Sequence, residues 1–120
     1  MKAEIKDYVS TDVESFWEWQ PDDPTDVILN IDIYIGPEND DFQQIFQFVL
    51  VTPNALSRLL ESQPILNGRH YWFMESFDWE SLEQELERVV RECVGNNWEE
   101  VAALLSRHFH WEYEDHKYLD

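Results

Sequence analysis

The sequence predicts an α+β fold: a single domain over residues 1–120, with three helices packed on an antiparallel or mixed sheet of about five strands. Three observations support this prediction. The length of 120 residues fits one domain. Hydrophobic residues make up 43% of the chain and aromatic residues 15%, which suffices for a compact core. Apolar residues recur with strand spacing in some segments and with helix spacing in others.

The N-terminal 25 residues predict one strand followed by a long connection. Residues 2–9 alternate weakly between apolar and polar types, which favours a strand. In residues 10–25, Pro21 and Pro24 bracket two aspartates, and this arrangement disfavours both helix and strand. We therefore expect this stretch to be an irregular connection.

A hairpin is expected next. Residues 26–35 form the clearest strand pattern, because every second position from Leu29 to Ile35 is leucine or isoleucine and the positions between are polar. The turn-rich residues 36–41 follow, and then residues 42–51 alternate again with phenylalanine on one face. The two strands should therefore pair in an antiparallel manner.

Helix signals begin at the end of the hairpin. Thr52 is a suitable N-cap and Pro53 suits the first helical position, so we expect a helix that stops before Pro64. Residues 69–74 alternate after an Asn-Gly turn and predict a short strand.

Two more helices and a last strand complete the predicted order β-β-β-α-β-α-α-β. Asp78 is expected to cap a helix that Gly95 ends. Asn97 opens a segment resembling a capping box, and its helix should run to about Arg107. Alternation over residues 109–113 predicts the last strand. The apolar stripe of the first of these helices consists of Trp79, Leu82, Leu86, Val89, Val90 and Cys93.

The charge of the chain predicts a basic protein partner. Twenty-six acidic residues against eight basic ones give a net charge of -18, and the pI is near 4.3. Such a chain repels nucleic acids and anionic membranes, so neither is expected as a partner. It attracts a basic surface and speeds encounter with it. The alternative interpretation is a surface that serves solubility alone.

The charge is also unevenly distributed along the chain. No Lys or Arg occurs between Lys6 and Arg58, and we call residues 7–57 the acid-only segment. Solubility does not require such segregation, whereas electrostatic steering does. Two tryptophans in the segment are either interface anchors or core residues. The candidate partner-binding residues are Asp22, Asp23, Asp32, Tyr34, Glu38, Asp40, Asp41, Trp17 and Trp19.

Signals for catalysis are weak, and the sequence predicts no enzyme, no cofactor and no metal. The single cysteine, Cys93, lies on an apolar stripe and is expected to be buried and inert. His108 and His110, with Asp115 and His116 nearby, could ligate a metal, but no motif of ligand spacing supports them. Two carboxylates close together mean little in so acidic a chain. No Gly-rich phosphate loop or nucleophile motif occurs.

The expected location is the cytoplasm. The N-terminal residues carry no apolar stretch typical of a secretory signal, and no apolar run approaches the length of a membrane span. One cysteine fits a reducing compartment. The sequence makes no prediction of the oligomeric state.

Several segments of the sequence match one family pattern. They are Met1–Lys6, Ile35-Gly36-Pro37 with its acidic loop, the Phe-rich strand ending in Thr52-Pro53, Gly68-Arg69-His70-Tyr71, and a C-terminal block of residues 93–102, Leu105-Ser106-Arg107 and residues 111–115. Together they resemble the immunity protein 8 family of bacterial polymorphic toxin systems, over nearly the whole chain, and the C-terminal block is the most specific part. The resemblance implies an antidote in the cytosol that binds a cognate toxin domain and blocks it, and it implies no catalytic residue.

The leading hypothesis from the sequence is therefore an immunity protein whose acidic surface faces a basic toxin. Many secreted bacterial toxin domains are nucleases, whose clefts for nucleic acid are basic. One alternative is an acidic adaptor or regulatory module that binds a basic protein unrelated to toxins. Another is a small metal-dependent hydrolase that uses the C-terminal histidines and acids.

Overall fold

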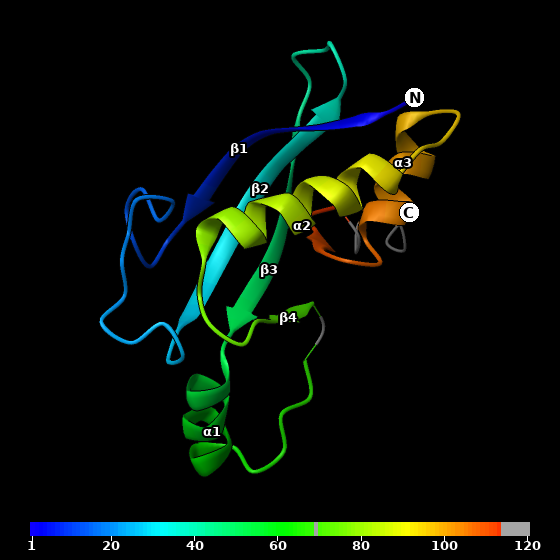
Figure 1. Cartoon of the computed structure of the whole chain (residues 1–120). Helices are drawn as coiled ribbons and strands as arrows, with labels where there is room; N and C mark the ends of the chain where they lie inside the picture. The colour runs from blue at the N-terminus through cyan, green and yellow to red at the C-terminus, as the bar shows by residue number, and fades with distance from the viewer. Residues whose placement is uncertain (69, 114–120) are drawn as a thin grey trace.

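The computed structural model describes residues 1–68 and 70–113 (Figure 1). A mixed five-stranded sheet and three helices confirm the predicted α+β class and the predicted order of elements. The elements are β1 (Ala3–Ser10), β2 (Ile28–Pro37), β3 (Gln44–Val51), α1 (Pro53–Ser62), β4 (Tyr71–Phe73), α2 (Trp79–Glu92), α3 (Trp98–Leu105) and β5 (His110–Trp111).

The sheet has β2 and β3 at its centre. The order is β1-β2-β3-β4, with β1–β2 and β2–β3 antiparallel and β3–β4 parallel. The short β5 pairs with β3 in antiparallel orientation at Phe46 and Gln47, and β4 pairs with the same strand from Val49 to Val51. A register shift between Ile5 and Asp7 interrupts β1.

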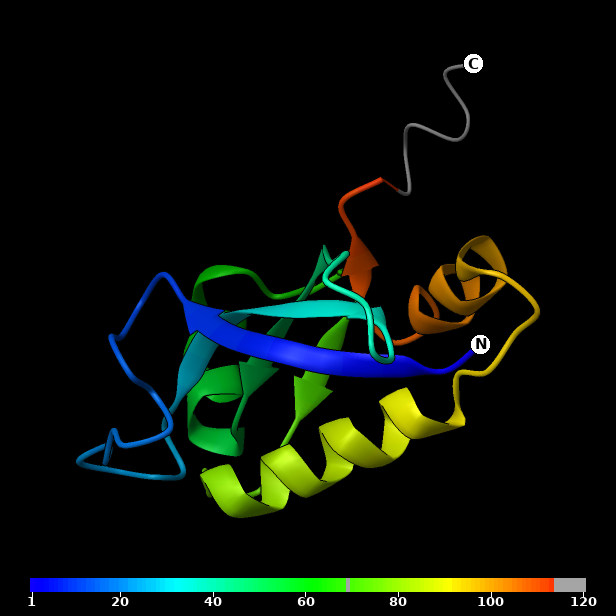
Figure 2. The same cartoon turned by 90° about the horizontal axis from the view of Figure 1, so that it is seen from above.

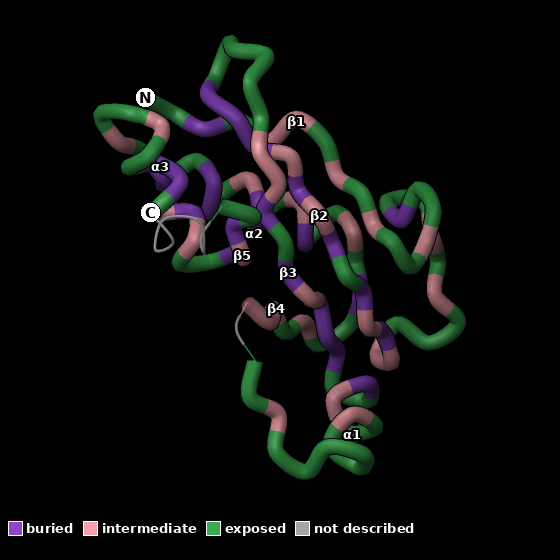
Figure 3. Tube along the Cα trace, turned by 180° about the vertical axis from the view of Figure 1, so that it is seen from behind, coloured by how far each residue is buried: buried purple, intermediate pink, exposed green. Residues whose placement is uncertain are grey.

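Alternation along the strands gives the sheet one buried and one uncovered face. The predicted apolar positions of β2 and the phenylalanines of β3 are at most 2% exposed. Helix α2 lies across this buried face (Figure 2). On the opposite face, no helix of the described chain covers the central strands (Figure 3). The register puts these residues on this open face: Asp7, Val9, Asn30, Asp32, Tyr34, Ile45, Gln47 and Val49.

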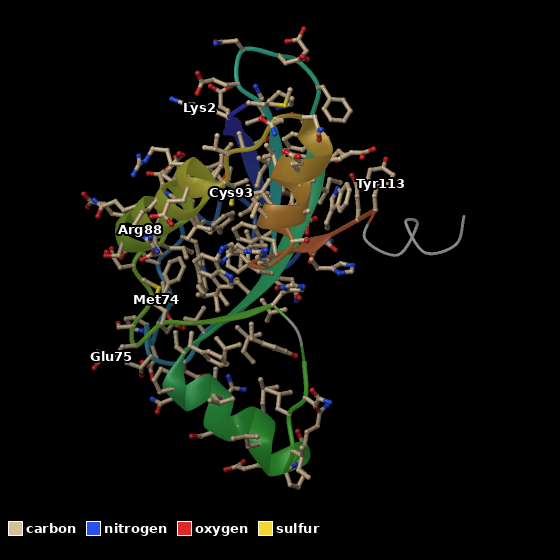
Figure 4. All side chains as sticks on the ribbon, turned by 90° about the vertical axis from the view of Figure 1, so that its right-hand side faces the viewer. Lys2, Met74, Glu75, Arg88, Cys93 and Tyr113 are labelled. Carbon is tan, nitrogen blue, oxygen red and sulfur yellow. The ribbon has the colours of Figure 1, made fainter. Side chains whose placement is uncertain are left out.

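Helix α2 begins and packs as its sequence predicts. The Asp78 carboxylate accepts a hydrogen bond from the Ser81 N–H at 3.2 Å, which caps the helix. Most of the predicted apolar stripe is buried, and Cys93 is only 4% exposed. Figure 4 shows Cys93 in the interior and Arg88 on the outer side of α2, away from the sheet.

Helix α3 starts with a shifted version of the predicted capping box. The Asn97 side chain accepts from the Glu100 N–H at 3.0 Å. The Glu100 carboxylate in turn accepts from the N–H of Asn96 at 2.7 Å, one residue before the expected donor. The helix ends at Leu105, two residues before the predicted end at Arg107.

Thr52 has a different role from the predicted one. It occupies the N-cap position before Pro53, but its hydroxyl makes no capping hydrogen bond. The side chain is 1% exposed, and its Oγ1 accepts a hydrogen bond from the Val27 N–H at 2.6 Å. The threonine turns inward because the chain entering β2 passes beside the start of α1, where the Asn54 N–H donates to Thr25 O at 3.0 Å.

Helix α1 extends from one end of the sheet (Figure 1). It ends at Ser62, before Pro64, as predicted, and of its residues only Ala55 is buried. Leu60 on its apolar stripe is 38% exposed. The core therefore depends mainly on the sheet, α2 and α3.

The hairpin between β2 and β3 needs a glycine at position 36. A Cβ on Gly36 would lie 1.8 Å from the backbone oxygen of Phe42. No side chain fits in that space, so the close approach of the two strands requires glycine. Strand β2 therefore continues through Pro37, two residues beyond the predicted end.

Candidate functional site

The acid-only segment forms the centre of the open face. Strands β2 and β3 both lie within residues 7–57, so neither contributes a Lys or Arg to this face. The basic Arg88 lies on the far side of α2 (Figure 4), in ion pairs with Glu85 and Glu92. This arginine therefore lies away from the open face.

The predicted acidic residues fall at three places along β2 rather than in one cluster. Asp22 and Asp23 belong to the connection that leads into the strand, whereas Glu38 and its neighbours form the turn at the other end (Figure 1). Because β2 has 10 residues, the two groups are roughly 33 Å apart along the strand. Asp32 and Tyr34 lie between them on the open face, both half-buried.

Two of the acidic side chains have structural roles. Asp23 Oδ1 accepts hydrogen bonds from the N–H of Thr25 at 3.0 Å and from its hydroxyl at 2.7 Å. These bonds hold the pKa of Asp23 below its usual value. Asp40 Oδ1 accepts from the Phe42 N–H at 2.9 Å and thereby shapes the hairpin turn. Substituting either residue would therefore change loop structure as well as charge.

The other three loop acids are available to a partner. Asp22, Glu38 and Asp41 are exposed, and within the described chain their side chains make no hydrogen bond or ion pair. Nearby, Lys6 Nζ is committed to the hairpin, because it donates to Asp40 O at 2.8 Å and to Glu4 Oε1 at 2.6 Å.

The two tryptophans belong to the connection between β1 and β2 and not to the strands of the open face. Trp19 is half-buried and packs edge-to-face on Phe77, with ring centroids 5.5 Å apart. Trp17 packs on Phe16 but is 42% exposed. Both line a hollow of about 330 Å³ beside the N-terminus of α2. The structure therefore separates them from Asp32 and Tyr34, with which the sequence grouped them.

A hollow of about 210 Å³ on the open face brings together residues that the sequence could not associate. We call it the Asp32 hollow. Gln47 Nε2 donates to Asp32 Oδ1 at 2.9 Å across the β2–β3 pair. The hollow is lined by Asn30, Ile31, Asp32, Gln47, Phe48, Val49, His70 and His110.

Sequence reasoning identified Asp32 as a candidate and missed its neighbours. The alternation of residues 42–51 did place Gln47 on the face opposite the phenylalanines. His110 was considered only as a metal ligand. Its position beside Gln47 follows from the pairing of β5 with β3, for which the sequence carries no local signal.

Further expectations concern the cysteine, metals and membranes. Cys93 is buried, as predicted, and this burial raises the pKa of its thiol. Within residues 1–68 and 70–113, no group of three or more His, Cys, Asp or Glu side chains could hold a metal ion. Asp115 and His116 lie outside the described residues. None of the described helices has the length and apolar character needed to span a bilayer.

Apolar side chains are exposed at the α1 end of the molecule, which the sequence did not predict. Phe73 is 65% exposed and stacks on Tyr71, with ring centroids 6.4 Å apart, and Ile65 is 85% exposed. The Phe73 side chain points into solvent because β4 is a short edge strand of the sheet.

Comparisons with known proteins gave one match. The model of the family described as Immunity protein 8 matches residues 3–116 of the chain. Neither the curated proteins nor the solved structures contain a match.

Proposed function

The chain belongs to the Immunity protein 8 family and has the role of an immunity protein against a toxin, and we propose that it acts by covering a basic surface of that toxin with the open face of its sheet. The observation that supports the proposal is the composition of this face. Its two central strands come entirely from the acid-only segment, and no described helix covers them.

Electrostatics supplies the physical reason. A protein with a net charge of -18 repels other acidic surfaces and attracts basic ones over long distances. Complementary charge speeds diffusional encounter more than it strengthens the final complex. An immunity protein in the cytoplasm must reach its toxin before the toxin reaches its target, so rapid association is the property to expect.

A nuclease toxin fits this surface best. A cleft that binds nucleic acid must be basic in order to hold the phosphate backbone. An acidic sheet face in that cleft would exclude the nucleic acid by contacting the same basic residues that hold the phosphate backbone. This inhibition is stoichiometric, and it needs neither a catalytic residue nor a cofactor in the immunity protein.

Co-expression tests the proposed function directly. If a large secreted protein is encoded beside the gene, its C-terminal domain is the partner to test, expressed in cells together with the immunity protein. We expect the immunity protein to restore growth and to co-purify with the toxin domain. Co-purification with an unrelated basic protein, without protection from the toxin domain, would instead indicate an adaptor.

Charge reversal tests the assignment of the face. The variant Glu38→Lys/Asp41→Lys changes two exposed acids of the hairpin that make no hydrogen bond in the described chain. The matched control, Glu75→Lys/Glu99→Lys, makes the same change in charge outside the acid-only segment. Glu87 is unsuitable as a control because it accepts a hydrogen bond from the Tyr8 hydroxyl at 3.3 Å.

The readout is the association rate with the toxin domain across a salt series. We expect the hairpin variant to associate about tenfold more slowly at low salt, with the difference shrinking as salt screens the charges. The control should change much less. Equal slowing of both variants would mean that net charge alone matters, and the proposed face would then be wrong.

A further inference from the structure

We propose that the Asp32 hollow receives an arginine side chain of the toxin, with the Asp32 carboxylate as its charged partner. This inference rests on the proposed function and specifies one contact within it. The hollow measures about 210 Å³ and lies near the middle of the open face, between the two acidic loops. A partner that covers the face would therefore have to cover this hollow.

The hydrogen bonds around the hollow leave an excess of acceptors. Gln47 directs its amide nitrogen to Asp32 Oδ1 at 2.9 Å, and Asn30 directs its amide nitrogen to Asp12 Oδ2 at 3.2 Å. The carbonyl oxygens of both amides accept no hydrogen bond from any residue that the structure describes, so they remain available as acceptors. Asp32 Oδ2 accepts no hydrogen bond from any residue that the structure describes. Such a site suits a ligand that carries positive charge and several donors.

The walls of the hollow favour arginine over lysine. The rings of His70 and His110 line one side, with centroids 6.1 Å apart and planes inclined by 40°. A guanidinium group is planar, so it stacks against flat rings while donating two parallel hydrogen bonds to a carboxylate. A lysine ammonium group is compact and strongly hydrated, and it gains less from flat walls.

The backbone holds both histidines in place before any partner binds. His110 belongs to β5 and is paired with Gln47. His70 adopts a left-handed backbone conformation, with a φ of 66°, and its carbonyl accepts the Val49 N–H at 3.1 Å. Both residues are therefore attached to β3, the strand that carries Gln47. A site organised in advance loses less entropy when it binds.

Asp32→Asn tests the contact, and Glu75→Gln is its matched control. Both substitutions keep the side-chain shape and remove one negative charge, but Glu75 is exposed and lies outside the acid-only segment. Loss of one partner from a desolvated charge pair acts mainly on dissociation. We expect Asp32→Asn to raise the Kd for the toxin domain about 30-fold, chiefly through faster dissociation. Glu75→Gln should change the dissociation rate less than about twofold.

A second measurement uses the immunity protein alone. Titration with N-acetylarginine methylamide should shift the NMR signals of Asn30 and Gln47 in the wild-type protein but not in Asp32→Asn. The lysine analogue should cause smaller shifts. The dispersion of the Asp32→Asn spectrum also verifies that this variant is folded.

The outcomes separate this inference from the proposed function. Failure of the wild-type protein to bind the toxin domain would overturn the proposed function. The titration would then show whether the Asp32 hollow binds an arginine side chain. Toxin binding with equal dissociation rates for both variants would overturn the arginine contact and leave the acidic face intact. Shifts that persist in Asp32→Asn, or that are as large with the lysine analogue, would also overturn it.

Discussion

The buried hydroxyl of Thr52 provides the sharpest test of the packing described above. Thr52→Val keeps the shape of the side chain and removes the acceptor that lies 2.6 Å from the Val27 nitrogen. Both residues are at most 2% exposed, so water cannot replace the lost partner. The Val27 carbonyl keeps its bond from the Thr52 N–H at 3.1 Å. The substitution therefore leaves a single buried N–H without an acceptor.

The expected loss in the free energy of unfolding comes from the unpaired Val27 N–H group. An unsatisfied buried donor destabilises a protein by about 1–3 kcal/mol, and we expect about 2 kcal/mol here. In a domain of this size, such a loss lowers Tm by about 8 °C. The assay is urea unfolding followed by tryptophan fluorescence, with the free energy of unfolding taken from the midpoint and slope.

Thr11→Val is the matched control, because Thr11 is exposed and its hydroxyl has no hydrogen bond within the described chain. It should change the free energy of unfolding by less than about 0.5 kcal/mol. If Thr52→Val stays within about 0.5 kcal/mol of this control, the hydroxyl does not join β2 to the start of α1 as described.

Two further predictions concern buried titratable groups. Burial, followed by the charges of Glu87 and Glu83, holds the pKa of Tyr8 well above its ordinary value of 10.0. The folded state therefore keeps the Tyr8 phenol proton to a higher pH than the unfolded chain does. The contribution of the protonated phenol to the free energy of unfolding is complete below about pH 10 and declines above it. Between pH 10 and 11, urea unfolding should show a steeper loss of stability in the wild type than in Tyr8→Phe, and equal slopes would contradict the assignment. Cys93 should react with a thiol reagent only as fast as the protein opens, and rapid labelling of the native protein would show that the thiol is accessible. Cys93→Ala should lower the free energy of unfolding in urea by about 1–2 kcal/mol through lost packing.

The buried face of the sheet could be predicted because strand alternation is a local property. Successive side chains of a strand point to opposite faces. Leucine and isoleucine at every second position of β2 therefore identify the face that packs in the core. The same alternation placed Asp32 and Tyr34 on the other face, where the structure has them. Helix caps at Asp78 and Asn97 were equally predictable, because a cap involves only neighbouring residues.

The absence of Lys and Arg from the two central strands was also determined by the sequence alone. The acid-only segment runs without interruption through both central strands. Any sheet built from these strands would therefore present a face whose two central strands lack basic residues. The arrangement of the acids in space was a different matter. The length and direction of β2 place the connection that contains Asp22 before one end of this strand and the turn that contains Glu38 at the other end.

The contacts that depend on distant segments were decided by the tertiary structure. The Thr52 hydroxyl bonds to Val27 instead of capping its own helix, because the chain entering β2 passes beside the start of α1. His110 reaches Gln47 because β5 pairs with β3, although 62 residues lie between them in the sequence. Periodicity tells which face a residue occupies within its own strand, but the neighbours it meets there depend on the register and order of strands, and packing of the whole chain sets both.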